Sequence, residues 1–175
     1  MTSTPPAPTT TATTPGTAPA VSPIPAGYTS ITPYLCVDGA AAAITFYESV
    51  FGATVVSRND GPDGTVAHCE LDLGVGRLQL SDPAPDHHLV APDGAGQVDH
   101  SYVLYCADVD ATYAAAVAAG ATGYGDPETF VTGDRFAALL DPWGHRWAVM
   151  TRVEDVPPQE AQRRVDEWVA AQAQP

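Results

Sequence analysis

Hydrophobic and polar residues alternate strictly along two neighbouring stretches, Val66 to Leu73 and Arg77 to Ser81. The apolar positions are Ala67, Cys69, Leu71, Leu73, Leu78 and Leu80, and the polar positions are His68, Glu70, Asp72, Arg77, Gln79 and Ser81. Because successive side chains of a β-strand point to opposite faces, an alternation with a period of two predicts strands. The two stretches therefore predict a sheet with one apolar and one polar face.

Two alanine-rich stretches have the spacing of helices. The first, Ala40 to Val50, would place Ile44, Tyr47 and Val50 or Phe51 on an inward face. The second is Ala111 to Ala119. A glycine follows each of them, Gly52 and Gly120, and glycine accepts the left-handed conformation that ends many helices.

Further strands are expected at Ile31 to Val37, Thr54 to Arg58, Ser101 to Ala107, about Phe130 to Leu140, and Trp147 to Thr151. The last two flank Asp141-Pro142-Trp143-Gly144, a type I turn signature that predicts a hairpin.

These elements form an internal repeat. Tyr34 to Asp38 leads into the first helix, and Tyr102 to Asp108 leads into the second, about 68 residues later. Two copies are too few for a solenoid, so we expect one pseudo-symmetric domain made of two fused modules.

The ends of the chain differ from this repeat. Residues 1–27 are mostly Thr, Pro, Ala and Ser, and we expect them to be a disordered tail without the features of a signal peptide. Residues 28–175 form the predicted domain, with a Pro-, Gly- and Asp-rich connector at 82–98 and a C-terminal helix at 157–172. The apolar stripe of that helix would be Val165, Trp168 and Val169.

Charge and cysteine content restrict the function. The formal net charge is -14 with only 7 Lys and Arg residues, which argues against nucleic acid and anionic membranes as partners. No apolar run is long enough to span a bilayer. Cys36, Cys69 and Cys106 are isolated and odd in number, which fits reduced thiols and a cytoplasmic location.

Four segments together resemble the glyoxalase/bleomycin-resistance/extradiol-dioxygenase superfamily, also called vicinal oxygen chelate, and within it the PhnB-like branch. They are YLCVDGAAAAITFYESVFGA, HCELDLGVGRLQLSD, GDRFAALLDPWGHRW and EDVPPQEAQRR. The resemblance implies an α+β fold with two tandem βαβββ modules, at 28–83 and 99–152, whose curved mixed sheet cups a cavity. It also implies a homodimer.

Metal enzymes of this superfamily bind a divalent ion at four equivalent strand positions. By the repeat alignment, the resemblance places these positions at Thr32, Gln79, Ser101 and Ala148. Only Gln79 is an ordinary ligand for such ions, so we expect the usual metal site to be absent and predict no cofactor. A register slip of one residue would bring His100 near a ligand position, but it would also turn every side chain to the other face.

The polar sheet face is the predicted ligand site. It would present Thr32, Tyr34, His68, Glu70, Arg77 and Gln79, with Ser101 and Arg135 from the second module. His68 and Glu70 are also the candidates for catalysis, since histidine titrates near neutral pH. Alternatively, His68 and Glu70 face solvent at a sheet edge, and Arg135 pairs with an acid. Trp147 is expected in the core, and His145 in the turn.

Three functions remain open at this point. The first is a metal-free protein that binds a small molecule in a dimer cavity. The second is a metal-dependent lyase, isomerase or dioxygenase with ligands shifted to His68, Glu70 and Gln79. The third is a protein-interaction role for the tail or the acidic surface. Because one fold supports many chemistries, fold analogy does not choose among them.

Overall fold

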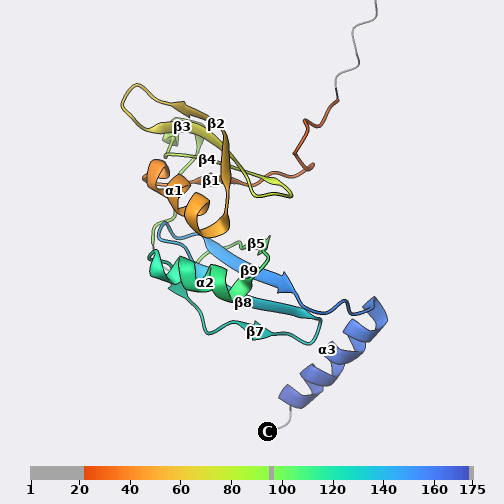
Figure 1. The fold of residues 1–175 in the computed structure, drawn as a ribbon. Coiled ribbons are helices and arrows are strands. Elements are labelled where there is room, and N and C mark those ends of the chain that lie inside the picture. The colour runs from red at the N-terminus through yellow and green to blue at the C-terminus, as the bar shows by residue number, and fades with distance from the viewer. Residues whose placement is uncertain (1–21, 95–96, 174–175) are drawn as a thin grey trace, which may run out of the picture.

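Two mixed sheets, each with one helix across it, follow one another along the chain (Figure 1). The structure, a computed structural model, describes residues 22–94 and 97–173. The predicted disorder of residues 1–27 therefore falls mainly on residues that lie outside the described part. Among the described helices, none has both the length and the hydrophobicity of a membrane span.

The first sheet has the strand order β1-β4-β3-β2, with β1 parallel to β4 and the other pairs antiparallel. Its elements are β1 (Tyr34–Cys36), α1 (Ala40–Phe51), β2 (Thr54–Asp60), β3 (Val66–Asp72) and β4 (Arg77–Ser81). A short 3-10 helix, η1 (Pro85–His87), lies in the connector.

The second sheet repeats this plan with the order β5-β9-β8-β6, and β7 also pairs with β8. Its elements are β5 (Tyr102–Tyr105), α2 (Val109–Ala118), β6 (Thr122–Gly123), β7 (Glu128–Thr129), β8 (Asp134–Leu140) and β9 (Arg146–Arg152). The predicted α+β class with two tandem βαβββ modules is confirmed.

Several strands differ from their predicted bounds. β1 is shorter than Ile31 to Val37, and Ile31 is exposed, although the carbonyl of Pro33 still accepts a hydrogen bond from the backbone of Gln79. The alternation in β3 is correct from residue 68 onward but wrong at Ala67, which is exposed while Val66 is buried. The cause is a register shift between β2 and β3. Asn59 pairs with His68 but Asp60 pairs with Val66, so Ala67 is skipped and Val66 takes the inward-facing place.

Helix α1 supplies much of the core beneath the first sheet. It buries Ile44, Tyr47 and Val50 against the apolar face, as its spacing predicts, and also Phe46, which the prediction did not include. The helix ends at Gly52, whose φ of 68° is readily accessible to glycine. Helix α2 begins at an Asp108 cap, whose side chain accepts a hydrogen bond from the backbone of Ala111.

The β8–β9 hairpin joins the two modules through one buried carboxylate, that of Asp141. Its Oδ2 accepts hydrogen bonds from the Tyr47 hydroxyl of α1 at 2.7 Å and from Trp147 Nε1 at 2.9 Å. Its Oδ1 accepts from the backbone N–H groups of Trp143 and His145 at 3.0 and 2.9 Å. The predicted hairpin turn is confirmed, and its aspartate also fixes the first module against the second.

His145 makes a second contact between the modules. It is only 4% exposed, and its Nε2 lies 3.1 Å from the carbonyl oxygen of Cys36 in β1, to which it donates. Its Nδ1 is buried and has no hydrogen-bond partner among the described residues. Burial lowers the pKa of His145, because removal from water disfavours the charged imidazolium.

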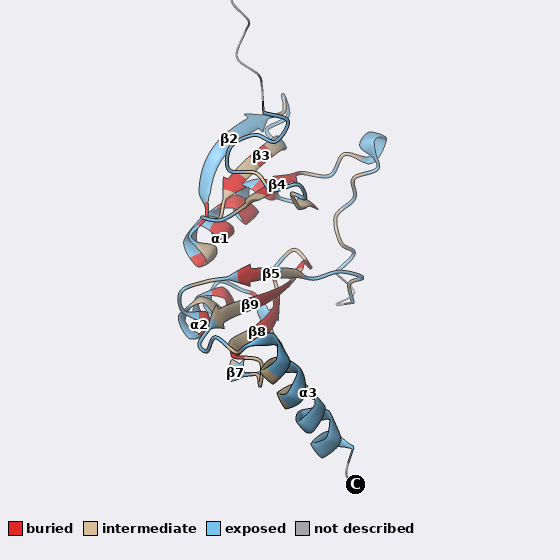
Figure 2. Ribbon diagram, turned by 90° about the vertical axis from the view of Figure 1, so that its right-hand side faces the viewer, coloured by how far each residue is buried: buried red, intermediate tan, exposed pale blue. Residues whose placement is uncertain are grey.

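Helix α3 (Pro158–Gln172) extends away from the rest of the chain (Figure 1). It begins near the predicted Pro157 and buries none of its residues fully, so its ribbon in Figure 2 is pale blue and tan, without red. Trp168 contacts Phe130 with ring centroids 5.3 Å apart, and Arg164 forms an ion pair with Glu154 at 2.8 Å. These contacts hold the helix beside the second module.

Candidate functional site

Four predicted site residues lie together on the polar face of the first sheet. Glu70 and Gln79 are direct partners across β3 and β4, and Gln79 Nε2 donates to Glu70 Oε1 at 3.2 Å. His68 Nε2 lies 3.4 Å from the same oxygen, and the rings of His68 and Tyr34 are 5.8 Å apart. Because Leu71, Leu78 and Leu80 are buried on the helix side of this sheet, the alternation leaves these polar groups on the open side.

The sequence did not point to a further member of this cluster, Tyr28. The pKa of Glu70 is lowered, and the main cause is hydrogen bonding from Tyr28. Hydrogen bonding from His68 lowers it further. In turn, the bond to Glu70 raises the pKa of Tyr28. Tyr28 precedes the first strand and belongs to no periodic pattern, so only the adjacent Gly27 could have signalled a turn there.

Arg77 lies at the edge of the same cluster. Its Nη1 is 2.8 Å from Asp72 Oδ2, and its Cζ lies 5.8 Å from the centre of the Tyr28 ring. Its Nε is buried, and within the described ranges no group accepts a hydrogen bond from it. The guanidinium therefore has one carboxylate partner and one aromatic neighbour, with bonding capacity left over.

Of the other predicted ligand-binding residues, Ser101 and Arg135 lie in the second module, apart from this cluster. Thr32 is half-buried in the segment before β1. Ser101 precedes β5 and accepts a hydrogen bond from Arg146 Nη1 at 2.6 Å. Arg135 in β8 forms a two-pronged ion pair with Asp110 of α2, with distances of 2.6 and 2.7 Å. Ser101 and Arg135 thus have partners of their own in the second module.

The positions of the implied metal ligands do not fit a divalent cation. Ala148 carries no donor atom and lies between Val103 and Ala138 on neighbouring strands. The Ser101 hydroxyl already bonds a guanidinium, which places positive charge where a metal ion would sit. In the part of the chain that the structure describes, no three His, Cys, Asp or Glu side chains are grouped so as to hold a metal ion.

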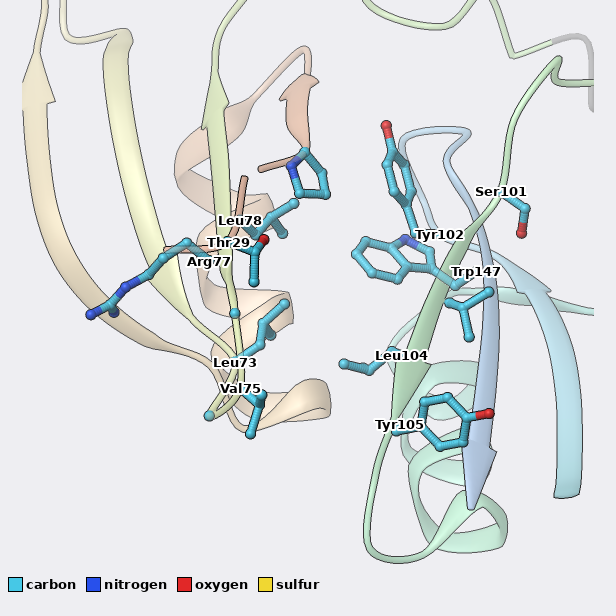
Figure 3. Close-up of a pocket in the computed structure, with 14 residues that line it drawn as sticks. Thr29, Leu73, Val75, Arg77, Leu78, Ser101, Tyr102, Leu104, Tyr105 and Trp147 are labelled. Atoms are coloured by element: carbon cyan, nitrogen blue, oxygen red, sulfur yellow. The ribbon is translucent and has the colours of Figure 1, made fainter. Parts of the chain in front are cut away.

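A cavity lies elsewhere, in the seam between the modules. It has a volume of about 600 Å³ and lies between the β3–β4 turn and β5 (Figure 3). Leu73, Leu78, Tyr102, Leu104 and Trp147 line it, and the side chain of Arg77 extends away from it. The seam cavity is therefore mainly apolar, whereas His68, Glu70 and Gln79 lie on the polar sheet face instead. We place the candidate site on the polar face, because recognition there has charged and hydrogen-bonding groups to act through.

Comparisons with known proteins agree with this architecture. The family model described as Glyoxalase/Bleomycin resistance protein/Dioxygenase superfamily matches residues 27–149. An uncharacterized protein of Mycobacterium bovis, Mb0911c, is 35% identical over 130 residues, which cover 73% of this chain and 86% of the relative.

Two solved structures share the fold. TioX from Micromonospora sp. ML1 is 22% identical, with a TM-score of 0.56, and the match covers 71% of this chain and 98% of TioX. A PhnB protein from Bacillus cereus is 21% identical, with a TM-score of 0.56, and the match covers 70% of this chain and 99% of that protein.

Proposed function

The chain belongs to the Glyoxalase/Bleomycin resistance protein/Dioxygenase superfamily, and from this premise we propose that it binds a small organic molecule on the polar face of its first sheet. In this proposal the ligand is held by Tyr34, His68, Glu70, Arg77 and Gln79, without the superfamily's metal ion. The protein acts as a binding protein and not as a metalloenzyme.

The observation that supports this most directly is the network around Glu70. Two neighbouring side chains, His68 and Gln79, converge on one oxygen of its carboxylate. The side chains of His68 and Glu70 remain 31% and 22% exposed, so an incoming molecule can reach them. A small set of convergent polar groups beside aromatic rings is how small-molecule sites are usually built.

A second copy of the chain would close this open face into a cavity. Strand β5 is one edge of the second sheet, and its Val103 and Tyr105 side chains, which line the seam cavity, are 57% and 55% exposed. Exposed apolar side chains on a sheet edge favour association with another protein surface. In the proposed homodimer, the second module of one chain covers the polar face of its partner.

A metal-dependent enzyme is the second candidate, and one observation favours it. His68, Glu70 and Gln79 approach one another closely enough to form a shifted ligand set. Nitrogen and oxygen ligands of this kind suit zinc, nickel, manganese or ferrous iron.

The deciding experiment combines metal analysis with ligand binding. Untagged protein, purified without chelator and supplied with nickel, zinc, manganese and iron, is expected to retain no stoichiometric metal by plasma mass spectrometry. Compounds found in a thermal-shift screen of small aromatic molecules should bind Glu70→Ala at least about tenfold more weakly, because a charged hydrogen-bond acceptor is lost.

The matched control is Glu128→Ala, which removes an exposed carboxylate from β7 of the other module. This variant should bind the same compounds as the wild type does. Stoichiometric metal that disappears in His68→Ala would instead establish the enzyme candidate. Equal binding of the compounds by the wild type, Glu70→Ala and Glu128→Ala would refute the polar face as the ligand site.

A further inference from the structure

We propose that Tyr28 occupies the Glu70 site as a tethered stand-in for a phenolic ligand, and that hydroxylated aromatic molecules bind by displacing it. This inference rests on the proposed function and deepens it, because it names the chemical class of the ligand and the residue with which that ligand competes. Glu70, Arg77 and Tyr28 carry it.

Tyr28 reaches the site from a short strap, residues 25–30, that pairs with no strand of the sheet. The local bonds of the strap are a turn, in which the Tyr28 backbone donates to the Pro25 carbonyl at 3.2 Å, and a bond from Thr29 Oγ1 to the Ile31 carbonyl at 2.5 Å. Apart from the half-buried Tyr28, residues 25–30 are exposed. Opening such a segment costs little, because few bonds and little buried surface are lost.

The phenol of Tyr28 uses the two recognition groups that the site offers an aromatic ligand. Its ring lies beside the Arg77 guanidinium, whose Cζ is 5.8 Å from the ring centre, and its hydroxyl lowers the pKa of Glu70, as expected of a donor that faces this carboxylate. A hydrogen bond to an ionised acceptor is stronger than one between neutral groups, and a cation near a ring face adds further attraction. The same two contacts are available to any free phenol of similar size.

Tyr28 also fits the site incompletely, which leaves room for a better occupant. Arg77 Nε is buried next to Gly27, the residue before Tyr28, and within the described residues it donates to no acceptor. A ring carbon cannot accept that bond, whereas an oxygen or nitrogen beside the hydroxyl of a ligand can. A phenol with a neighbouring acceptor therefore satisfies more of the site than Tyr28 does.

Gly27 fixes the strap against Arg77 and provides a second way to open it. Its φ is +84°, and a Cβ added there would lie 2.6 Å from Arg77 Nη2. A side chain at this position is strained and also meets the guanidinium. Gly27→Ala should therefore lift the strap while the phenol of Tyr28 remains in the chain.

The test is titration calorimetry of full-length protein with 2-naphthol and with its methyl ether, 2-methoxynaphthalene. The wild type should prefer 2-naphthol, because only the free hydroxyl can donate to Glu70. Tyr28→Ala and Gly27→Ala should each bind 2-naphthol about tenfold more tightly, because the competing occupant has gone. Tyr124→Ala, a change at a half-exposed tyrosine of the second module, is the matched control and should bind as the wild type does.

The outcomes separate this inference from the function on which it rests. If Glu70→Ala weakens 2-naphthol binding but neither strap variant tightens it, the face binds ligands and Tyr28 is not a competitor. If Tyr28→Ala binds more weakly than the wild type, Tyr28 is part of the ligand site and the inference is overturned. If Glu70→Ala changes nothing, the proposed site itself fails. Equal affinity of the wild type for both probes would exclude recognition through the hydroxyl.

Discussion

The carboxylate of Asp141 shows how one buried residue can hold two modules together. It is 3% exposed, and each of its two oxygens accepts two hydrogen bonds. A buried charge is tolerated only when its bonding capacity is met in this way. Burial next to this carboxylate raises the pKa of Tyr47, so the tyrosine stays a donor.

Replacement of Asp141 by asparagine should destabilise the protein strongly. The amide nitrogen that replaces one oxygen cannot accept hydrogen bonds, so two buried donors lose their partner. We expect the free energy of unfolding to fall by about 2–4 kcal/mol in urea denaturation. Tyr47→Phe removes a single donor and should cost about 1–3 kcal/mol. An Asp141→Asn protein as stable as the wild type would show that the carboxylate does not join the modules.

His145 should make stability depend on pH in the mildly acidic range. An exposed histidine in the unfolded chain titrates near 6.5, whereas burial lowers the pKa of His145 in the folded chain. As the pH falls below 6.5, His145 binds a proton in the unfolded state but stays neutral in the folded state. The contribution of His145 is therefore complete above that pH and is lost as the pH falls towards the folded pKa.

Urea denaturation between about pH 7 and pH 5 measures this effect. The wild type should lose up to about 1.4 kcal/mol per pH unit from this group, and His145→Gln should show a flatter profile. Parallel profiles for the two proteins would mean that burial does not affect the titration of His145.

At the scale of elements, the predictions from sequence succeeded where the pattern is local. The alternation in β3 and β4 and the spacing in α1 each follow from one sheet or helix face meeting one core. The position of Glu70 and Gln79 on one face follows as well, because an alternation in two adjacent strands places their polar residues together, whereas the register that pairs these two residues comes from the structure. Fold class and most of the polar cluster could therefore be predicted.

The failures have a common physical cause, which is contact between residues distant in the sequence. No periodicity connects Tyr28 to Glu70, or His145 to the carbonyl of Cys36, because these contacts depend on how separate segments pack. The exposure of Ala67 depends on a shift in pairing with β2, which the sequence of β3 alone does not encode. The short strands β6 and β7 have only two residues each and carry no pattern to detect.

For the whole molecule, the exposed β5 edge predicts a dimer in solution. Light scattering after size exclusion should give a mass of about twice the 18.2 kDa of one chain. Val103→Asp places a charge on that edge and should shift the protein towards the monomer. Val117→Asp makes the same change on α2, where Val117 is 42% exposed, and should leave the dimer intact. If the wild type is a monomer in solution, the proposal that a second copy covers the polar face is wrong.

The hydrogen bond between Tyr47 and Asp141 also has a consequence for the symmetry of the repeat. At the same offset in the second copy, helix α2 carries Ala115 where α1 carries Tyr47, so the bond has no mirror image. The first module alone has Tyr47 without Asp141, and the second module alone has Asp141 without Tyr47. The contact is therefore one-sided: it exists only where both modules belong to the same folded chain, and it gives the two copies different roles in holding the molecule together.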